Sequence, residues 1–279
     1  MQPASASDRE FHLSDREFDE IRRLVREHTG ISLAESKREL VYSRLVRRLR
    51  HLALPDFADY LELLARGEPA ELEEFCNAIT TNLTSFFREA HHFEFLANSI
   101  LPALEKRNAA SRRLRIWSAG CSTGEEPYSI AIVLREAQAR FRGWDVRVLA
   151  TDLDSRVVAH AQAGEYRPER FEKMAEARRD RWFEPGRPGT LTASAALKSL
   201  ITFRQLNLLH RWPFKGPFDV IFCRNVVIYF DKETQRALFG RIAELQREGD
   251  RLCIGHSESL FKICDRYQPI GKTIYQRVP

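Results

Sequence analysis

The chain has 279 residues, of which 43% are hydrophobic and 30% are charged, and its formal net charge at pH 7 is +5. This length suits one large domain or two modest ones, and the apolar fraction allows a sizeable core. The polar start of the chain argues against a signal peptide, and no stretch approaches the roughly 18 apolar residues of a membrane span. The five cysteines are scattered, without a Cys-x-x-Cys pair or clustered histidines. We therefore expect reduced thiols, no metal site and a cytoplasmic location.

Helical periodicity dominates the first part of the chain. Residues 1–13 are expected to form a flexible tail, and residues 14–88 a small helical domain. Ser14 precedes an acidic turn and then apolar residues at helical spacing, which is typical of a capped helix, and Gly30 is expected to end that helix. Further helices are predicted over residues 34–52, 57–66 and 71–81.

The second predicted helix carries a dense basic face. Lys37, Arg44 and Arg48 fall on one stripe when residues are placed about 100° apart, with Arg47 beside it. A run of charge is usually a solvated face, but few acidic residues interrupt this one. We therefore interpret these four residues as a docking surface for an acidic partner. Nucleic acid is the alternative partner, but no aromatic stacking pattern accompanies the basic residues.

Polar side chains close the helical domain. Asn82, Thr84 and Arg88 flank a pair of phenylalanines, and by composition alone this segment is a helix end with a packed aromatic pair. Residues 89–110 carry apolar residues on one side of a helix and are predicted to form a linker helix.

From residue 111 to residue 279, strand and helix patterns alternate. Such alternation predicts a mostly parallel sheet covered by helices. Residues 165–200 interrupt the alternation with many Arg, Pro, Gly and Ala residues, which we interpret as a small inserted subdomain. Strands are expected over residues 115–118, 146–151, 201–205, 218–223, 251–255 and 273–277. No helix follows the last of these strands, so an antiparallel edge is expected.

A glycine loop separates the first predicted strand from its helix. Gly120 and Gly124 carry no Cβ, so a backbone can approach a ligand closely there. A strand, a glycine loop and a helix in succession build nucleotide-type sites in α/β folds. An ordinary turn is equally compatible with two glycines four residues apart.

Polar residues follow other predicted strands, at the edge where open α/β sheets bind ligands. Asp152 can accept hydrogen bonds from both hydroxyls of a ribose, although helix capping is the alternative. Asn207 could pair with an adenine edge or be only a turn residue. Arg224 and Asn225 end an apolar strand. The arginine could instead form a structural ion pair, and Tyr229 could belong to the core.

Taken together, these segments resemble the CheR family of chemotaxis receptor glutamate O-methyltransferases. The matching stretches follow the family order over nearly the whole chain, at residues 37–50, 80–89, 122–129, 207–209, 223–230 and 255–258. The resemblance implies an all-α N-terminal domain joined to an α/β, Rossmann-like methyltransferase domain that binds S-adenosylmethionine and releases S-adenosylhomocysteine. It further implies that the substrate is a glutamate side chain on the acidic helical coiled coil of a chemotaxis receptor, and that the product is a methyl ester.

The resemblance also assigns roles to individual residues. Arg88 and Tyr229 are implied to lie closest to the transferred methyl group. The implied cofactor contacts are Asn82, Thr84, Arg88, Glu126, Asp152, Asn207, Leu208, Arg224 and Asn225, and Gly120 of the glycine loop completes the predicted set. We expect a monomer that binds no nucleic acid, uses no metal and reaches the membrane only through the receptor.

One departure from the family pattern concerns the insertion. Some members carry a Gly-x-Gly turn there and use it to grip a peptide at the receptor C-terminus. Within residues 183–190 the glycines have a different spacing, so we expect engagement mainly through the basic helix, without a tethering peptide. The alternative functions are a methyltransferase acting on RNA or a small molecule, and a cofactor-binding regulator without turnover.

Overall fold

The computed structural model describes residues 10–279, and the chain divides into two compact units, Met1–Thr81 and Asn82–Pro279. The division lies seven residues before the predicted end of the helical domain at Arg88. The reason is Phe86, whose buried ring packs on Phe171 of the second unit. The predicted tail is also too long: residues 1–9 lie outside the described residues, but Leu13 is buried in the helical core.

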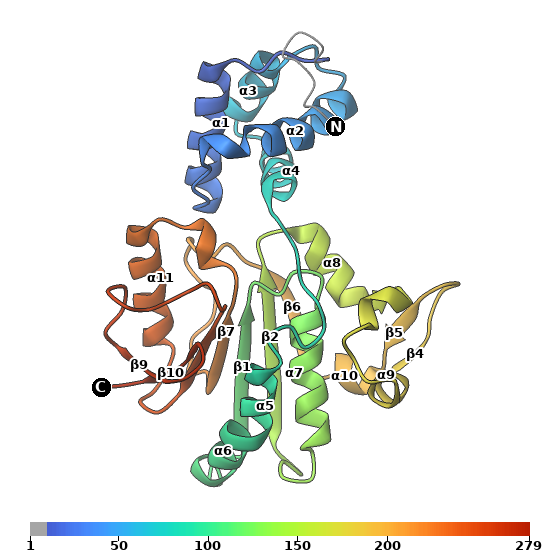
Figure 1. The fold of residues 1–279 in the computed structure, drawn as a ribbon, viewed down its shortest axis with the longest axis vertical. Helices are drawn as coiled ribbons and strands as arrows, with labels where there is room; N and C mark the ends of the chain where they lie inside the picture. The colour runs from blue at the N-terminus through green and yellow to red at the C-terminus, as the bar shows by residue number, and fades with distance from the viewer. Residues whose placement is uncertain (1–9) are drawn as a thin grey trace. The chain divides into compact units, whose positions relative to one another are not determined.

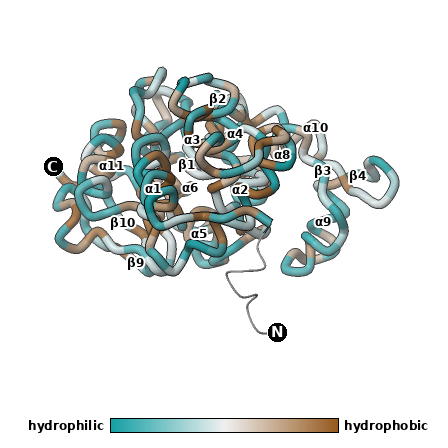
Figure 2. Tube along the Cα trace, turned by 90° about the horizontal axis from the view of Figure 1, so that it is seen from above, coloured by the Kyte–Doolittle hydropathy of each residue, from teal (hydrophilic) through white to brown (hydrophobic). Residues whose placement is uncertain are grey.

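The first unit is helical, as predicted. Its elements are α1 (Asp15–Thr29), a 3-10 turn (Glu35–Lys37), α2 (Arg38–Leu52), α3 (Phe57–Ala65) and α4 (Pro69–Ile79). Ser14 and Glu17 form a capping box at the start of α1, and Gly30 ends it in the left-handed conformation with φ of 75°. Hydrophobic and hydrophilic segments alternate along α1 (Figure 2), because only one face of the helix packs against the core.

The second unit is built around a mostly parallel sheet (Figure 1). Within residues 10–279 its strands lie in the order β6-β2-β1-β7-β8-β10-β9. They are β1 (Arg113–Ala119), β2 (Asp145–Asp152), β6 (Ile201–Gln205), β7 (Val220–Cys223), β8 (Arg251–Ile254), β9 (Tyr267–Gly271) and β10 (Ile274–Arg277). The sheet is parallel from β6 to β8, and β10 runs antiparallel to both β8 and β9. The antiparallel strand was predicted, but β9, which is the edge strand, was not.

Helices cover both faces of this sheet. They are α5 (His91–Phe95), α6 (Leu101–Arg107), α7 (Glu125–Glu136), α8 (Ser155–Ala163) and α11 (Lys232–Glu244). The predicted linker helix is α5 and α6 joined by a π-helical segment, Leu96–Ile100, and its apolar side packs with the residues of β1 and α7. Helix α11 packs on the other face, where Phe239 and Trp117 belong to one core cluster. None of the helices within residues 10–279 combines the length and apolar character needed to cross a membrane.

The predicted insertion is a small antiparallel subdomain. Its strands, in the order β3-β5-β4, are β3 (Glu165–Tyr166), β5 (Leu191–Ala193) and β4 (Phe183–Pro185). The helices α9 (Glu176–Trp182) and α10 (Ala195–Lys198) accompany them. The subdomain lies beside α8, away from α11 (Figure 1). Its core is aromatic, and Phe86 is part of it.

Candidate functional site

The glycine loop between β1 and α7 packs closely against neighbouring segments. Gly120 has φ of 124°, and a Cβ there would overlap the side chain of Val226. Gly124 has φ of 100°, and a Cβ there would lie 2.6 Å from the Tyr166 hydroxyl oxygen. Both glycines are therefore required by backbone conformation and by packing. The main-chain N–H groups of Gly120 and Cys121 donate to the Thr151 carbonyl, which ties the loop to the end of β2.

Asp152 joins the glycine loop to the end of β2. Its Oδ2 accepts a hydrogen bond from the Ser122 N–H at 2.8 Å, and its Oδ1 accepts one from the Asp154 N–H at 3.1 Å. Burial raises the pKa of Asp152 to about 6, against the lowering effect of these N–H donors. Asp154 caps α8, as expected, and also accepts from the Asn82 side chain at 2.8 Å. The structure thus brings together Asn82, the glycine loop and the tip of β2.

Glu126 and Arg224 form a buried ion pair. Their side chains meet at 2.8 Å, and Glu126 also accepts a hydrogen bond of 2.7 Å from the Ser118 hydroxyl. The other guanidinium nitrogen of Arg224 donates to the Arg88 carbonyl at 2.5 Å and lies 3.4 Å from Glu89. Arg224 therefore forms the structural ion pair that was the alternative to a cofactor contact. Glu126 and Arg224 contact protein groups, and they hold the Arg88 backbone at the carboxyl edge of the sheet.

The segment 82–89 is anchored by its aromatic pair. Phe86 has no exposed surface and packs within the subdomain core, whereas Phe87 packs on Phe93 with ring centroids 5.2 Å apart. The Thr84 carbonyl accepts a hydrogen bond from the Arg170 side chain at 3.0 Å. Arg88 is half-buried, and its guanidinium donates to the Leu83 carbonyl at 2.7 Å. The segment is thus an ordered loop and not the end of a helix.

The residues after β7 are organised by a carboxylate that the sequence analysis did not select. Asn225 has φ of 57°, and its N–H donates to Glu258 Oε2 at 3.0 Å. The Val227 N–H donates to Glu258 Oε1, also at 3.0 Å. Tyr229 ends the 3-10 turn Val227–Tyr229, is half-buried, and has no hydrogen bond to its hydroxyl among residues 10–279. Residues 255–258 matched the family pattern, which is the only signal that could have indicated Glu258.

Asn207 and Leu208 follow β6 at the same edge of the sheet. The Asn207 side chain accepts a hydrogen bond from the Leu209 N–H at 2.9 Å, so it forms the turn that was the alternative role. Leu208 is buried, and its carbonyl accepts from Arg241 at 2.9 Å. The turn therefore has a defined position beside the tip of β2, the neighbouring strand.

Next to the Glu126–Arg224 ion pair lies a cluster of two histidines and a carboxylate. Glu89, His91 and His92 bring potential metal ligands within 4.8 Å of one another. Burial lowers the pKa of His92 to about 3, so the imidazole is neutral. Burial opposes the ionisation of Glu89, but a hydrogen bond from His256 and the charge of Arg224 lower the pKa of this carboxyl to about 2. The carboxylate thus already has the Arg224 guanidinium and the His256 ring as partners, and the positive charge of the guanidinium opposes the binding of a further cation.

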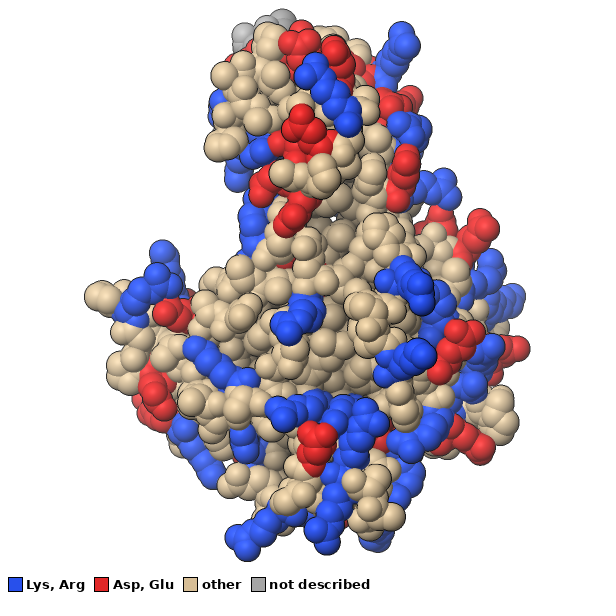
Figure 3. Space-filling view, turned by 180° about the vertical axis from the view of Figure 1, so that it is seen from behind, with Lys and Arg blue, Asp and Glu red and all other residues tan. Residues whose placement is uncertain are grey.

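The predicted basic face extends over the 3-10 turn, which holds Lys37, and α2, and two of its arginines are engaged in internal contacts. Arg44 donates to the carbonyls of Ile79 and Thr80, and Arg48 pairs with the buried Glu71. The remaining candidates, Lys37 and Arg47, are exposed and form no ion pair among residues 10–279. On the face drawn in Figure 3, acidic and basic side chains are mixed over the helical unit. On the same face of the larger unit, lysines and arginines gather toward the end where α6 lies in Figure 1.

Comparison with known proteins agrees with this arrangement. Residues 16–80 match the family model for the CheR methyltransferase all-alpha domain, and residues 82–276 match that for the CheR methyltransferase SAM binding domain. The chain is 46% identical to chemotaxis protein methyltransferase 2 of Pseudomonas aeruginosa, over 95% of this chain and 94% of that protein. It is 42% identical to the chemotaxis protein methyltransferase of Escherichia coli, over 94% of this chain and 91% of that protein. The chain therefore belongs to the CheR family of S-adenosylmethionine-dependent chemotaxis protein methyltransferases.

Proposed function

We propose that this protein transfers the methyl group of S-adenosylmethionine to glutamate side chains of chemotaxis receptors, forming glutamyl methyl esters. The observation that carries the proposal is the gathering of Asn82, Asp152, Asn207 and Asn225 at the carboxyl edge of a sheet whose sequence matches a SAM binding domain. Methylation of this kind would adjust receptor signalling during chemotactic adaptation.

The donor and acceptor groups at this edge suit an adenosine ligand. The Asp152 oxygens accept the main-chain N–H groups of Ser122 and Asp154 and keep lone pairs for the hydroxyls of a ribose. The loop at Gly120 and the turn at Asn207 and Leu208 would border the nucleoside, with Asn225 on the far side. Asn82, Thr84 and Arg88 would approach from the anchored segment. Glu126 and Arg224 would act mainly by holding that segment in place, because their charged atoms already contact protein groups.

The contribution of the protein to the reaction is to position the acceptor carboxylate against the methyl group. S-adenosylmethionine, when bound, supplies a methyl group that is already activated by the sulfonium. A glutamate titrates near about 4.3, so the acceptor carboxylate is ionised at pH 7 and no general base is needed. The protein must hold the carboxylate oxygen at roughly 3–3.5 Å from the methyl carbon and in line with the bond that breaks. Arg88 and Tyr229 are the side chains that we assign to this task, and a water-poor site favours the neutralisation of charge.

Receptor recognition would use the exposed part of the basic face, Lys37 and Arg47, against an acidic coiled coil. The hairpin between β4 and β5 has Gly186 and Gly189 in place of a Gly-x-Gly turn. We therefore expect methylation to persist when the C-terminal tail of the receptor is deleted, and loss of methylation on deletion would contradict this. Binding should weaken at high salt because exposed charges are screened. We propose that the protein acts as a monomer and contacts the membrane only through the receptor.

The decisive experiment incubates the protein with radiolabelled S-adenosylmethionine and membranes rich in chemotaxis receptors. We expect label on the receptor band that alkali releases as volatile methanol, because alkali hydrolyses an ester. Alkali-stable label would instead indicate another acceptor atom, as in an RNA or small-molecule methyltransferase. Cofactor binding without any label on the receptor would favour the alternative function, a cofactor-binding regulator without turnover.

A further inference from the structure

The Glu258 side chain is a buried carboxylate surrounded by main-chain N–H groups. Only 7% of the residue surface is exposed. Its Oε2 accepts hydrogen bonds from the N–H groups of Asn225 at 3.0 Å and Gly255 at 2.5 Å, and its Oε1 accepts from the Val227 N–H at 3.0 Å. A carboxylate in this position replaces the partners that the chain loses where β7 and β8 end.

The carbonyl side of the turn that Glu258 holds is bound by α11, because the Gln235 side chain donates to the Val227 and Phe230 carbonyls at 2.9 Å. The N–H side of the turn is bound by Glu258. Asn225 is in the left-handed region, which costs free energy for a residue with a side chain. It packs so closely on Gly255 that a Cβ there would lie 2.8 Å from the Asn225 main-chain nitrogen. Such a conformation persists only when its surroundings determine it, and the Glu258 carboxylate provides the hydrogen bonds that do so.

A second carboxylate ties the loop after β8, which carries Glu258, to the anchored segment. The His256 ring nitrogen Nδ1 lies 2.9 Å from Glu89 Oε1, and Glu89 follows Arg88 directly. The loop after β8 therefore contacts both segments that carry the assigned side chains. Through Glu258 it holds the turn that leads to Tyr229, and through His256 it contacts the end of the segment that carries Arg88.

We propose that Glu258 is a positioning residue for methyl transfer, because its carboxylate fixes the turn that presents Asn225 to the cofactor and Tyr229 to the transferred methyl group. This inference rests on the proposed function. Glu258 itself need not touch the cofactor or the receptor, since both of its oxygens are engaged with main-chain N–H groups.

Glu258→Gln is the sharpest test, because it keeps the shape of the side chain. One terminal atom becomes an NH2 donor and must face either the Val227 N–H or the N–H groups of Asn225 and Gly255. If this variant does not fold, Glu258→Asp takes its place, because it keeps the charge but withdraws the carboxylate by one methylene.

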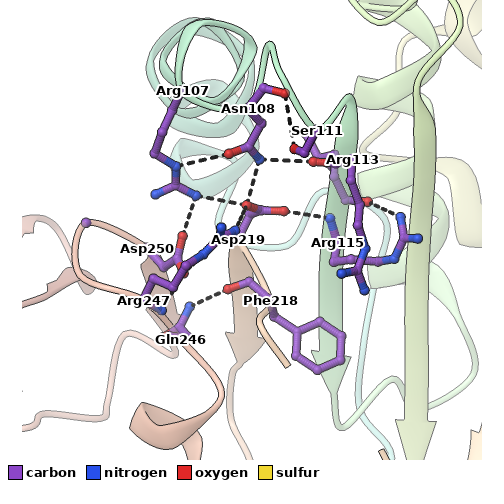
Figure 4. Close-up of polar contacts among 12 residues, drawn as sticks. Arg107, Asn108, Ser111, Arg113, Arg115, Phe218, Asp219, Gln246, Arg247 and Asp250 are labelled. Carbon is purple, nitrogen blue, oxygen red and sulfur yellow. Dashed lines mark hydrogen bonds and ion pairs between the residues drawn. The ribbon is translucent and has the colours of Figure 1, made fainter. Parts of the chain in front are cut away.

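Asp219→Asn provides a matched control at the opposite edge of the sheet. Asp219 precedes β7 and is 2% exposed. Like Glu258, it accepts a main-chain hydrogen bond, from the Arg115 N–H at 2.8 Å, and it also accepts from Arg107 and Asn108 (Figure 4). Its replacement should lower stability to a similar degree. Asp219 lies at the amino end of β7, however, whereas Asn225 lies just beyond the carboxyl end of the same strand.

The readouts are the Kd for S-adenosylmethionine, measured by titration calorimetry, and kcat with receptor membranes. Both are measured at a temperature at which circular dichroism shows each variant to be folded. We expect Glu258→Gln to raise Kd and to lower kcat by at least about tenfold each, a size typical for a supporting residue of a site. Asp219→Asn should stay within about twofold of the wild type. A Glu258 variant within that range, or an equal loss in Asp219→Asn, would overturn the proposal.

The proposed function and the positioning role of Glu258 can be refuted separately. If the wild-type protein binds S-adenosylmethionine but methylates no receptor, the proposed function is wrong. The comparison of Kd values still decides whether Glu258 organises the cofactor side of the site, because it requires no receptor.

Discussion

The anchoring of the site segment by Phe86 can be tested through stability. The ring is fully buried, stacks on Phe171 with centroids 4.9 Å apart, and meets Tyr166 and Phe183 edge-on at 5.0 and 5.3 Å. Burying a phenylalanine contributes about 1.5–3 kcal/mol, and aromatic pairs add about 0.5–1.5 kcal/mol each. Phe86→Ala should therefore lower the free energy of unfolding by about 3–5 kcal/mol, as is typical of this substitution in a core. For a domain of this size that is a fall in Tm of roughly 6–20 °C.

The neighbouring Phe87 supplies the control. It is half-buried and contacts Phe93 and the guanidinium of Arg178, so Phe87→Ala should cost about 1–2 kcal/mol. Urea unfolding and calorimetry of the full chain would measure both variants, and titration calorimetry would show weaker S-adenosylmethionine binding for Phe86→Ala. If Phe86→Ala cost no more than Phe87→Ala, the segment would not be anchored in the subdomain, and our reasoning about the site would be wrong.

Further substitutions test individual groups. Arg88→Ala should lose most turnover while its circular dichroism and Tm stay close to those of the wild type, and near-normal turnover would exclude a major catalytic role. Asp152, with a pKa of about 6, should bind S-adenosylmethionine more weakly as pH falls below 6, by up to about tenfold per unit, and a flat profile would refute its role as an ionised acceptor. Burial raises the pKa of Asp250 to about 6, so the folded state holds this proton more tightly than the unfolded state. Its contribution to stability is then present below about pH 4 and lost between about pH 4 and 6, by at most about 3 kcal/mol. Urea unfolding at pH 4 and 7 should show this loss in the wild type and not in Asp250→Asn.

Most of the fold follows from local patterns. Ser14 and Gly30 bound α1 because capping and left-handed termination are properties of single residues. The alternation after residue 111 predicted a mostly parallel sheet because helix and strand periodicities differ along the chain. Strand β9 was missed because Tyr267 is its only buried residue, so it has no alternating apolar pattern. The end of the helical domain was misplaced because a phenylalanine pair does not reveal which core its rings enter.

In the candidate site too, residues with a local signal could be predicted from the sequence, whereas contacts between distant residues could not. Asp152 was selected because its position at a strand tip has a physical meaning in the sequence alone. The pairing of Arg224 with Glu126 joins residues 98 positions apart, so the sequence could offer it only as an alternative. Glu258 had no signal beyond the family match at residues 255–258, because two of its partners are main-chain N–H groups that follow β7, more than 30 residues earlier in the chain. On the basic face, periodicity predicted the stripe, but the loss of Arg44 and Arg48 to internal acceptors depends on how α4 packs on α2.

The boundary between Thr81 and Asn82 has a consequence for how such proteins can diversify. The proposed cofactor contacts all lie on one side of it, and the basic residues of α2 lie on the other. A single recombination point in the gene would therefore exchange the proposed target-recognition module and leave the chemistry intact. If the basic face recognises the receptor as proposed, chimaeras joined at this peptide bond would combine the receptor preference of one relative with the methyltransferase domain of another.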